Sequence, residues 1–271
     1  MNGQKEKSRK REIKMLPKLL IFDLDGTLLR SDKTISPRTH EAIRKCREQG
    51  TLVAISTVRG EKNIVPFVEN LKPDLVIACS GALVKNEDEY IYVVEFTEEE
   101  TRELIKGARE ICGPSVEITV DTRDTYYWNY SVDPNIADPT WGDTTYTDYN
   151  DFNGKGIKLC IEIHDPVDRV KMQERFPDCE ITKFVGNDWH LVLKKGKGKE
   201  DAIGQVCRHF GFGLEDVTSF GDDLVDIGMI KLCGTGVAMG NALPEVKAAA
   251  DIVIGTNNED GIAEYLEGLL G

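Results

Sequence analysis

The most constraining feature of this chain is an apolar run followed at once by two carboxylates, Leu19-Leu20-Ile21-Phe22-Asp23-Leu24-Asp25-Gly26-Thr27. A run without polar alternation predicts a strand of a parallel sheet that is covered on both faces. Such sheets bind ligands just beyond the carboxyl ends of their strands, so Asp23 and Asp25 are expected in a crevice. Two ionised carboxylates side by side repel each other unless a cation compensates them. The sequence therefore predicts a metal site here.

The two ends of the chain alternate between strand and helix patterns. Ser36-Pro37 is typical of a helix cap followed by proline, and Gly50 ends that helix. Further apolar runs predict strands at 52–55, 75–78, 217–220, 236–239 and 252–254, and helices are expected at 199–210, 226–231, 244–250 and 261–270. This pattern predicts an α/β fold with a doubly wound, Rossmann-like parallel sheet.

The middle of the chain shows strands in neighbouring runs, at 90–96, 124–130 and 158–163, with helices near 98–111 and 167–176. Clustered strands and helices indicate an inserted α+β unit. We therefore expect a basic, disordered tail over residues 1–16, a core domain over 17–82 and 191–271, and a cap domain over 83–190.

Composition limits the partners. The 271 residues carry a formal net charge of −13, which repels nucleic acid and anionic membrane surfaces, so an anionic substrate needs local positive charge. The seven cysteines show no Cys-x-x-Cys spacing, which favours a reducing cytoplasm. The basic amino terminus is not followed by an apolar span, because Asp23 and Asp25 interrupt it. We expect a cytoplasmic protein, a monomer or weak homo-oligomer, with neither nucleic-acid nor membrane partners.

Polar residues follow each predicted parallel strand of the core. The second strand leads to Ser56-Thr57-Val58-Arg59, the third to Ser80-Gly81, and the fourth to Gly221-Asp222-Asp223 with Asp226 beyond. Because parallel strands end at one edge of the sheet, these residues are expected to meet Asp23 and Asp25 there. Lys199 stands at a predicted helix start, although its neighbours Lys194, Lys195 and Lys197 are more typical of a solvated face.

The set Asp-x-Asp-Gly-Thr, Ser-Thr-x-Arg, a lysine at a helix start and Gly-Asp-x-x-x-Asp resembles the haloacid dehalogenase superfamily. Further motifs resemble its Cof-like subfamily IIB, which carries a large α+β cap of type C2: Ser80-Gly81-Ala82-Leu83, Lys199-Glu200-Asp201-Ala202, Val237-Ala238-Met239-Gly240-Asn241-Ala242 and Asn258-Glu259-Asp260-Gly261. The resemblance covers both halves of the core. The cap matches in position and length more than in sequence.

The resemblance implies a Mg²⁺-dependent phosphatase, a phosphoric monoester hydrolase acting on small phosphorylated metabolites through an aspartyl-phosphate. Asp23 would be the nucleophile and Asp25 the general acid, whose pKa would have to be raised by burial beside another carboxylate. Thr57 and Lys199 would contact the phosphoryl group. The implied metal ligands are Asp23, the Asp25 backbone carbonyl, Asp222 and, directly or through water, Asp226. Gly26, which permits a tight turn, Arg59, Ser80 and Gly81 are candidate substrate-binding residues.

The chain departs from the family pattern at Val58, Val225 and Ser80, where glycine, asparagine and asparagine are usual. These changes bear on Arg59 and on the exact role of Asp226, but none removes a required charge. A phosphomutase of the phosphomannomutase type shares the aspartate pair, and a non-catalytic phosphate-binding regulatory protein is a third reading. A dehalogenase is disfavoured because Asp25 is present.

An aromatic and acidic stretch, residues 121–151, marks the cap. It contains seven aspartates and the aromatics Tyr126, Tyr127, Trp128, Tyr130, Trp141, Tyr146 and Tyr149. Alternation predicts that Tyr126, Trp128 and Tyr130 share one face of a strand, and we expect that face to pack on the cap helices. Were the face to line the crevice, it would suit a sugar or another polyhydroxy phosphate.

Overall fold

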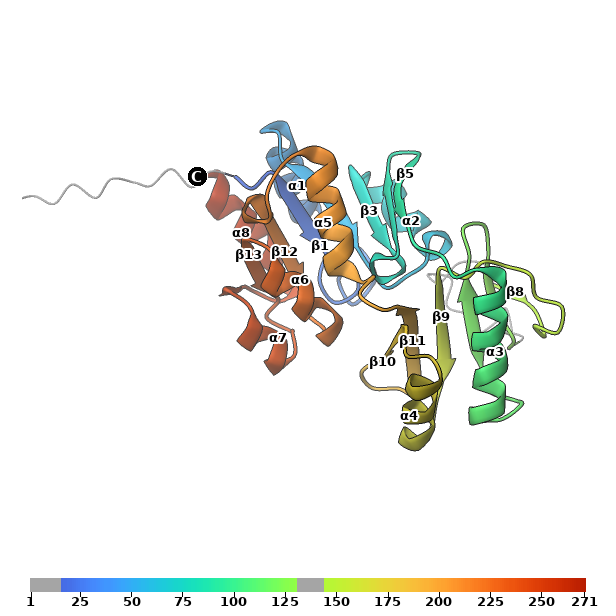
Figure 1. Cartoon of the computed structure of the whole chain (residues 1–271). Helices are drawn as coiled ribbons and strands as arrows, with labels where there is room; N and C mark the ends of the chain where they lie inside the picture. Colours follow the sequence, from blue (N-terminus) through green and yellow to red (C-terminus); the bar gives the residue numbers. More distant parts are fainter. Residues whose placement is uncertain (1–15, 131–143) are drawn as a thin grey trace, which may run out of the picture.

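A computed structural model describes residues 16–130 and 144–271 of the chain (Figure 1). The basic residues of the predicted tail lie outside this range, as do Trp141 and the aspartates Asp133, Asp138 and Asp143. Within the described ranges, no helix is both long enough and apolar enough to cross a membrane.

The core is built on an eight-stranded sheet of order β14-β13-β12-β1-β2-β3-β4-β5. The strands from β14 to β3 run parallel, and β4 and β5 are antiparallel to their neighbours. Their bounds are β1 Leu19–Phe22, β2 Leu52–Ser56, β3 Leu75–Ala78, β4 Leu83–Asn86, β5 Glu89–Val93, β12 Val217–Gly221, β13 Thr235–Ala238 and β14 Ile252–Val253. The chain winds outward in opposite directions from β1 and β12, so a ligand crevice is expected at the carboxyl ends of these two strands.

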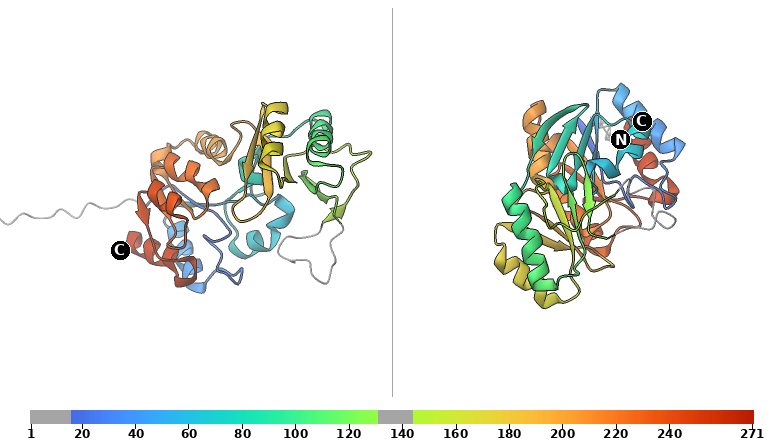
Figure 2. Two further views of the ribbon diagram at one scale, coloured as in Figure 1. Left: turned by 90° about the horizontal axis from the view of Figure 1, so that it is seen from below. Right: turned by 90° about the vertical axis from the view of Figure 1, so that its right-hand side faces the viewer.

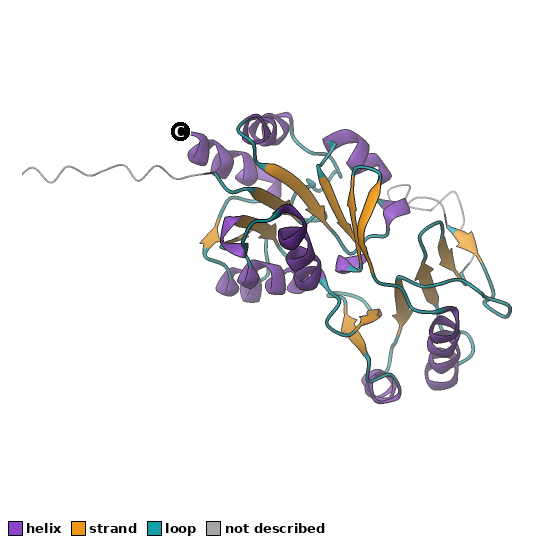
Figure 3. Cartoon of the chain, turned by 45° about the horizontal axis from the view of Figure 1, so that its top comes forward, coloured by secondary structure: helices purple, strands orange, loops and turns teal. Residues whose placement is uncertain are grey.

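Helices cover both faces of the core sheet (Figure 3). Buried side chains of α1 (Pro37–Glu48), α2 (Val65–Leu71) and α8 (Gly261–Leu270) pack on one face, and those of α5 (Lys199–Phe210) pack on the other. Helix α6 (Ile227–Leu232) contributes a buried side chain to each cluster. The remaining core helix, between β13 and β14, is α7 (Pro244–Ala249). The Ser36 side chain accepts from the Thr39 amide, and α5 ends at Gly211 in the left-handed conformation, so the predicted helix ends are confirmed.

The cap is a second, six-stranded sheet of order β10-β11-β9-β6-β7-β8 with helices on one face (Figure 2). Helices α3 (Glu98–Cys112) and α4 (Pro166–Arg175) pack there through a separate buried cluster. The strands are β6 Ile118–Asp121, β7 Tyr126–Trp128, β8 Thr145–Tyr146, β9 Lys158–Glu162, β10 Cys179–Lys183 and β11 Trp189–Lys194. The predicted α/β core with an inserted α+β cap is confirmed as a fold class.

Sheet membership differs from the predicted cap range of 83–190 in two places. Strands β4 and β5 form a hairpin that turns back on β3 and extends the core sheet, so the predicted strand at 90–96 belongs to the core. Strand β11 continues to Lys194 within the cap sheet. Pattern alone does not reveal which sheet an antiparallel hairpin joins, because both sheets offer an edge.

The cap aromatics are arranged differently from the expectation. Tyr127 packs on the helix-side cluster and meets Phe152 edge-on at 5.1 Å between ring centroids. Because side chains alternate along a strand, Tyr126 and Trp128 point to the opposite face. Trp128 contacts Trp189 there, with ring centroids 5.8 Å apart. The expectation that Tyr126 and Trp128 pack on the cap helices was therefore wrong.

Candidate active site

A buried lysine links the ends of three elements at the switch point of the core sheet. Lys199, the first residue of α5, donates from Nζ to Asp23 Oδ1 at 2.8 Å and to Asp226 Oδ1 at 2.7 Å. It also donates to the Ser56 carbonyl at the end of β2, at 3.1 Å. The Lys199 and Asp226 side chains are almost fully buried. Residues 176 positions apart in sequence are thus held in one network.

The acids outnumber this cation. Asp23, Asp222 and Asp226 each offer an oxygen, and these oxygens lie within 4.8 Å of one another. Burial, together with the Asp226 carboxylate, raises the pKa of Asp23, and Lys199 only partly opposes this. Burial also raises the pKa of Asp222 to about 6. Carboxylates held together at such a cost fit a hard divalent cation such as Mg²⁺, which would restore their ionised forms.

The third carboxylate has a structural duty as well. Asp226 Oδ2 accepts from the backbone amides of Asp222 and Asp223, at 3.1 and 3.2 Å. Its Oδ1 is occupied by Lys199, so both oxygens already have protein partners. Asp226 therefore shapes the loop after β12 and holds Lys199, which fits a bridge to a cation through water better than direct ligation.

The Gly26-Thr27 turn fits closely against Asp222. Gly26 has a φ of +82°, and a Cβ at this position would overlap the Asp222 carboxylate. Thr27 Oγ1 donates to Asp222 Oδ1 at 2.7 Å, which fixes the orientation of the carboxylate. Asn241 Nδ2 donates to the Gly26 carbonyl at 2.7 Å from the other side. Glycine is therefore required here both for its conformation and for the space it leaves.

Asp25 lies in an ion-pair cluster beside the acids. Arg59 Nε and Nη2 donate to its two carboxylate oxygens at 2.7 and 2.9 Å, and Lys33 Nζ donates at 2.7 Å. Burial alone would raise the pKa of Asp25, but the hydrogen bonds from Arg59 and Lys33 outweigh it and lower the pKa. The expected raised pKa is therefore wrong for this structure, because two cations reach the carboxylate.

The ends of β2 and β3 are tied together. Thr57 is buried; its Oγ1 accepts from the Arg59 amide at 3.2 Å, and its carbonyl accepts from the Ser80 amide at 2.9 Å. Ser80 and Gly81 have φ values of 55° and 103°, so the chain turns sharply after β3. A Cβ at Gly81 would overlap the backbone of Gly198, directly before Lys199. The structure therefore places Thr57 beside Arg59, and the Ser80-Gly81 turn beside the start of α5, which carries Lys199.

Sequence reasoning missed three contributors: Lys33, the pairing of Thr27 with Asp222, and the support of Gly26 by Asn241. Lys33 lies in the loop after β1 at a φ of 63°, and no periodic or motif signal marks it. Thr27 and Asn241 were within noted motifs, but only the folded loops show what their side chains hold.

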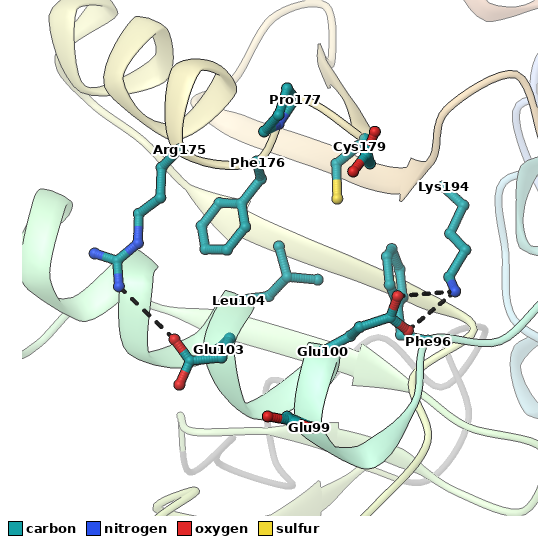
Figure 4. A pocket seen from close by; sticks show the side chains of 11 residues that line it. Phe96, Glu99, Glu100, Glu103, Leu104, Arg175, Phe176, Pro177, Cys179 and Lys194 are labelled. Atoms are coloured by element: carbon teal, nitrogen blue, oxygen red, sulfur yellow. Dashed lines mark hydrogen bonds and ion pairs between the residues drawn. The ribbon is translucent and has the colours of Figure 1, made fainter.

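A hollow of about 370 Å³ lies elsewhere, between α3 and the chain that leads from α4 into β10 (Figure 4). Phe96, Leu104 and Phe176 form apolar walls, while Glu100 and Lys194 pair at one end. None of the buried acids described above lines this hollow, so it is not the candidate active site.

A doubly wound sheet with an inserted cap and a buried acid cluster at its switch point defines the class: a capped, doubly wound α/β protein with a candidate metal site. The family model of haloacid dehalogenase-like hydrolases matches residues 20–266, and the chain belongs to this family. The predicted family and enzyme class are confirmed.

Relatives with full-length similarity carry phosphatase names. The chain is 33% identical to the Bacillus subtilis protein YkrA, over 91% of this chain and 95% of that protein. It is 31% identical to the B. subtilis 5-amino-6-(5-phospho-D-ribitylamino)uracil phosphatase YcsE, over 92% and 94% of the two chains. The solved structure of the subclass IIB sugar phosphatase BT4131 superimposes with a TM-score of 0.78 at 27% identity, covering 93% of this chain and 99% of that chain. The protein is thus a phosphatase of the haloacid dehalogenase family.

Proposed function

We propose that the protein hydrolyses phosphate monoesters of small metabolites, with Asp23 as nucleophile and Mg²⁺ as cofactor. The contact of Lys199 with Asp23, within a buried cluster that has more acids than cations, is the observation that carries this proposal. Phosphate monoesters are extremely inert, so an enzyme must position a nucleophile and neutralise charge on the phosphoryl group.

Asp23 would attack phosphorus through a carboxylate oxygen, forming an aspartyl-phosphate while the ester oxygen leaves. Lys199 keeps a positive charge beside Asp23, where it steadies the nucleophile and offsets charge on the incoming phosphoryl group. Thr57, buried at the end of β2, would donate a hydrogen bond to a phosphoryl oxygen. Water would then cleave the aspartyl-phosphate and release inorganic phosphate.

Asp25 would deliver the proton to the leaving alcohol and later take one from water. In the structure its carboxylate is paired with Arg59 and Lys33, which favour the ionised form. A substrate phosphate would compete for these cations because it carries more charge than Asp25. We therefore propose that Arg59 and Lys33 turn toward substrate, which releases Asp25 for proton transfer.

Mg²⁺ would be held by Asp23 and Asp222, with the Asp25 backbone carbonyl beside them and Asp226 bridging through water. When bound, the ion would neutralise charge on the phosphoryl oxygens. Two hydrogen bonds orient these carboxylates independently of the ion. Thr27 donates to Asp222, and the Asp222 amide donates to Asp226.

Two observations support a sugar or polyol phosphate as substrate. The cap face opposite its helices carries Tyr126, Trp128 and Trp189, and aromatic rings suit the apolar faces of sugars. The name of YcsE contains a phosphorylated ribityl group, and BT4131 is named a sugar phosphatase.

The test is a screen of phosphate monoesters with Mg²⁺, comparing the parent enzyme with Asp23→Asn. We expect Asp23→Asn to lose at least about a thousandfold in kcat, because the amide cannot act as nucleophile. Asp88→Asn, an exposed aspartate in the β4–β5 turn, is the matched control and should keep full activity.

EDTA should abolish turnover of the parent, and added Mg²⁺ should restore it. Undiminished phosphate release by Asp23→Asn would refute the proposal, and isomerisation activated by a bisphosphate would indicate a phosphomutase instead.

A further inference from the structure

The cap contains a buried ion pair that the proposed chemistry does not use. Lys158 Nζ lies 3.0 Å from Asp121 Oδ2, and each side chain is only 4% exposed. The two residues face each other across the β6–β9 pairing. Desolvating two charges is costly, and an apolar pair of similar size would often stabilise the sheet as well or better. The pair therefore calls for an explanation beyond cap stability.

Both members of the pair touch the core. Lys158 Nζ donates to the carbonyl of Val58 at 2.8 Å, across the boundary between cap and core. A Cβ at Gly60 would overlap Asp121 Oδ1, so the loop backbone lies directly against this carboxylate. On the core side, these polar contacts fall on the segment between β2 and the short helical turn Glu61–Asn63. Residues 58–60 are thus one place where the cap rests on the core, beside the apolar contacts that β9 and β11 make with the core cluster.

The residue between these two contacts is Arg59. Its side chain is 1% exposed and donates two hydrogen bonds to Asp25, and its guanidinium carbon lies 5.4 Å from the Phe67 ring centroid. Its carbonyl accepts from the Cys79 amide at 2.8 Å. The backbone on both sides of Arg59 is therefore held by the cap, while its side chain is directed at Asp25.

We propose that Lys158 and Asp121 are positioning residues that hold the Arg59 guanidinium beside Asp25 when the cap rests on the core. This inference deepens the proposed function and depends on its assignment of Arg59 as a substrate contact. Seating the cap and placing the arginine become one event, because the same ion pair that meets the core also fixes the loop. A seated cap thus adds to the core contacts that keep Arg59 in position.

The test is a double-mutant cycle between the cap pair and Arg59 in the full chain. Lys158→Met removes the donor to Val58, and Gly60→Ala forces the loop away from Asp121 without changing any charge. Each should lower kcat/KM about ten- to a hundredfold, since misplacing a substrate-binding group by about 1 Å costs this much. In an Arg59→Gln background, each should cost less than about threefold, because the group that they position is already gone.

Controls separate positioning from folding. Lys155→Met replaces an exposed lysine in the same segment, and Gly204→Ala adds a Cβ that meets only ordinary contacts in α5; both should leave kcat/KM unchanged. Lys158→Arg keeps a charged donor and should recover most of the loss. Thermal unfolding identifies variants that fail to fold, and Gly60→Ala decides the matter if Lys158→Met is among them.

Equal losses in the parent and Arg59→Gln backgrounds would overturn the inference, as would full activity of Gly60→Ala. If the ion pair served only stability, the substitutions would lower the unfolding temperature, but their effects on kcat/KM would add to that of Arg59→Gln. Failure of the proposed function is visible separately, since Asp23→Asn would then retain turnover whatever the result of the cycle.

Discussion

Two buried clusters each pair a lysine with aspartate, but their charge balance differs. One is the acid cluster around Lys199, and the other, which we call the cap seat, is the pair Lys158 and Asp121. Lys199 in the crevice faces Asp23 and Asp226, with Asp222 close by. Lys158 in the cap pairs with a single carboxylate, that of Asp121, and also donates to the Val58 carbonyl. The acid cluster therefore retains an excess of negative charge that a metal ion can satisfy, whereas the cap pair balances one charge against one. Charge imbalance in a buried cluster distinguishes a binding site from a positioning contact.

The largest effect is expected from breaking the crevice network with Lys199→Met. Removing the cation leaves two buried carboxylates uncompensated, so we expect a loss of about 3–5 kcal/mol in unfolding free energy without metal. We also expect kcat to fall by at least about a thousandfold, and Mg²⁺ to restore part of the stability but little of the activity. Urea unfolding with and without Mg²⁺ measures the first effect, with Lys195→Met as an exposed control.

The cap seat should respond differently when its charges are removed one at a time or together. Lys158→Leu leaves Asp121 buried and unpaired and should cost about 3–5 kcal/mol of unfolding free energy. Combining it with Asp121→Leu should return the stability to within about 1 kcal/mol of the parent. Denaturant titration of the three proteins checks this. A double variant no more stable than Lys158→Leu would show that the loss does not come from the unpaired Asp121 carboxylate.

A smaller effect is expected for the hydrogen bond that orients Asp222. Thr27→Val keeps the shape of the side chain but removes the donor to Asp222 Oδ1. Loss of such a support around a metal ligand typically weakens metal affinity about ten- to a hundredfold. We expect the Mg²⁺ concentration for half-maximal activity to rise accordingly, with little change in kcat at saturation. Thr34→Val, in an exposed turn, is the control.

The smallest effects concern two cap histidines away from the crevice. Asp188 and Glu162 raise the pKa of His164 above 6.5, while burial lowers the pKa of His190 below it. The contribution of His164 to stability is therefore complete below about pH 6.5 and lost as the pH rises through its folded pKa. His190 acts oppositely, because protonation as the pH falls below about 6.5 favours the unfolded chain. NMR titration should show the two rings on opposite sides of 6.5, and Asp188→Asn should lower only the pKa of His164 markedly.

Much of the core could be predicted because its signals are local. Continuous apolar runs mark the parallel strands, and the helix Lys199–Phe210 begins and ends as the pattern indicated. Strand ends of a parallel sheet meet at one edge, so Asp23 and Asp226 could be grouped without knowing any contact. Lys199 was placed with them only by the family resemblance, and the structure joins it to both. Their individual chemical roles remain predictions.

The cap seat could not be predicted, because its residues come together through pairing register and docking. Nothing in the local sequence marks Lys158 as the partner of Asp121 or of the Val58 carbonyl. The environment of Asp25 was missed for the same reason, since Lys33 reaches it from an irregular loop. Strand facing in the cap depended on a register that period-two alternation leaves open.

The sharp turn at Gly81 rests against Gly198, and Gly198 directly precedes Lys199. The returning strand of the cap is joined to Lys199 by Lys195–Gly198 alone. A molecule too bulky to fit beneath the cap would displace this short linker and move the Lys199 ammonium away from Asp23. Oversized molecules would thus be excluded in two ways, by steric obstruction and by loss of the Lys199–Asp23 contact.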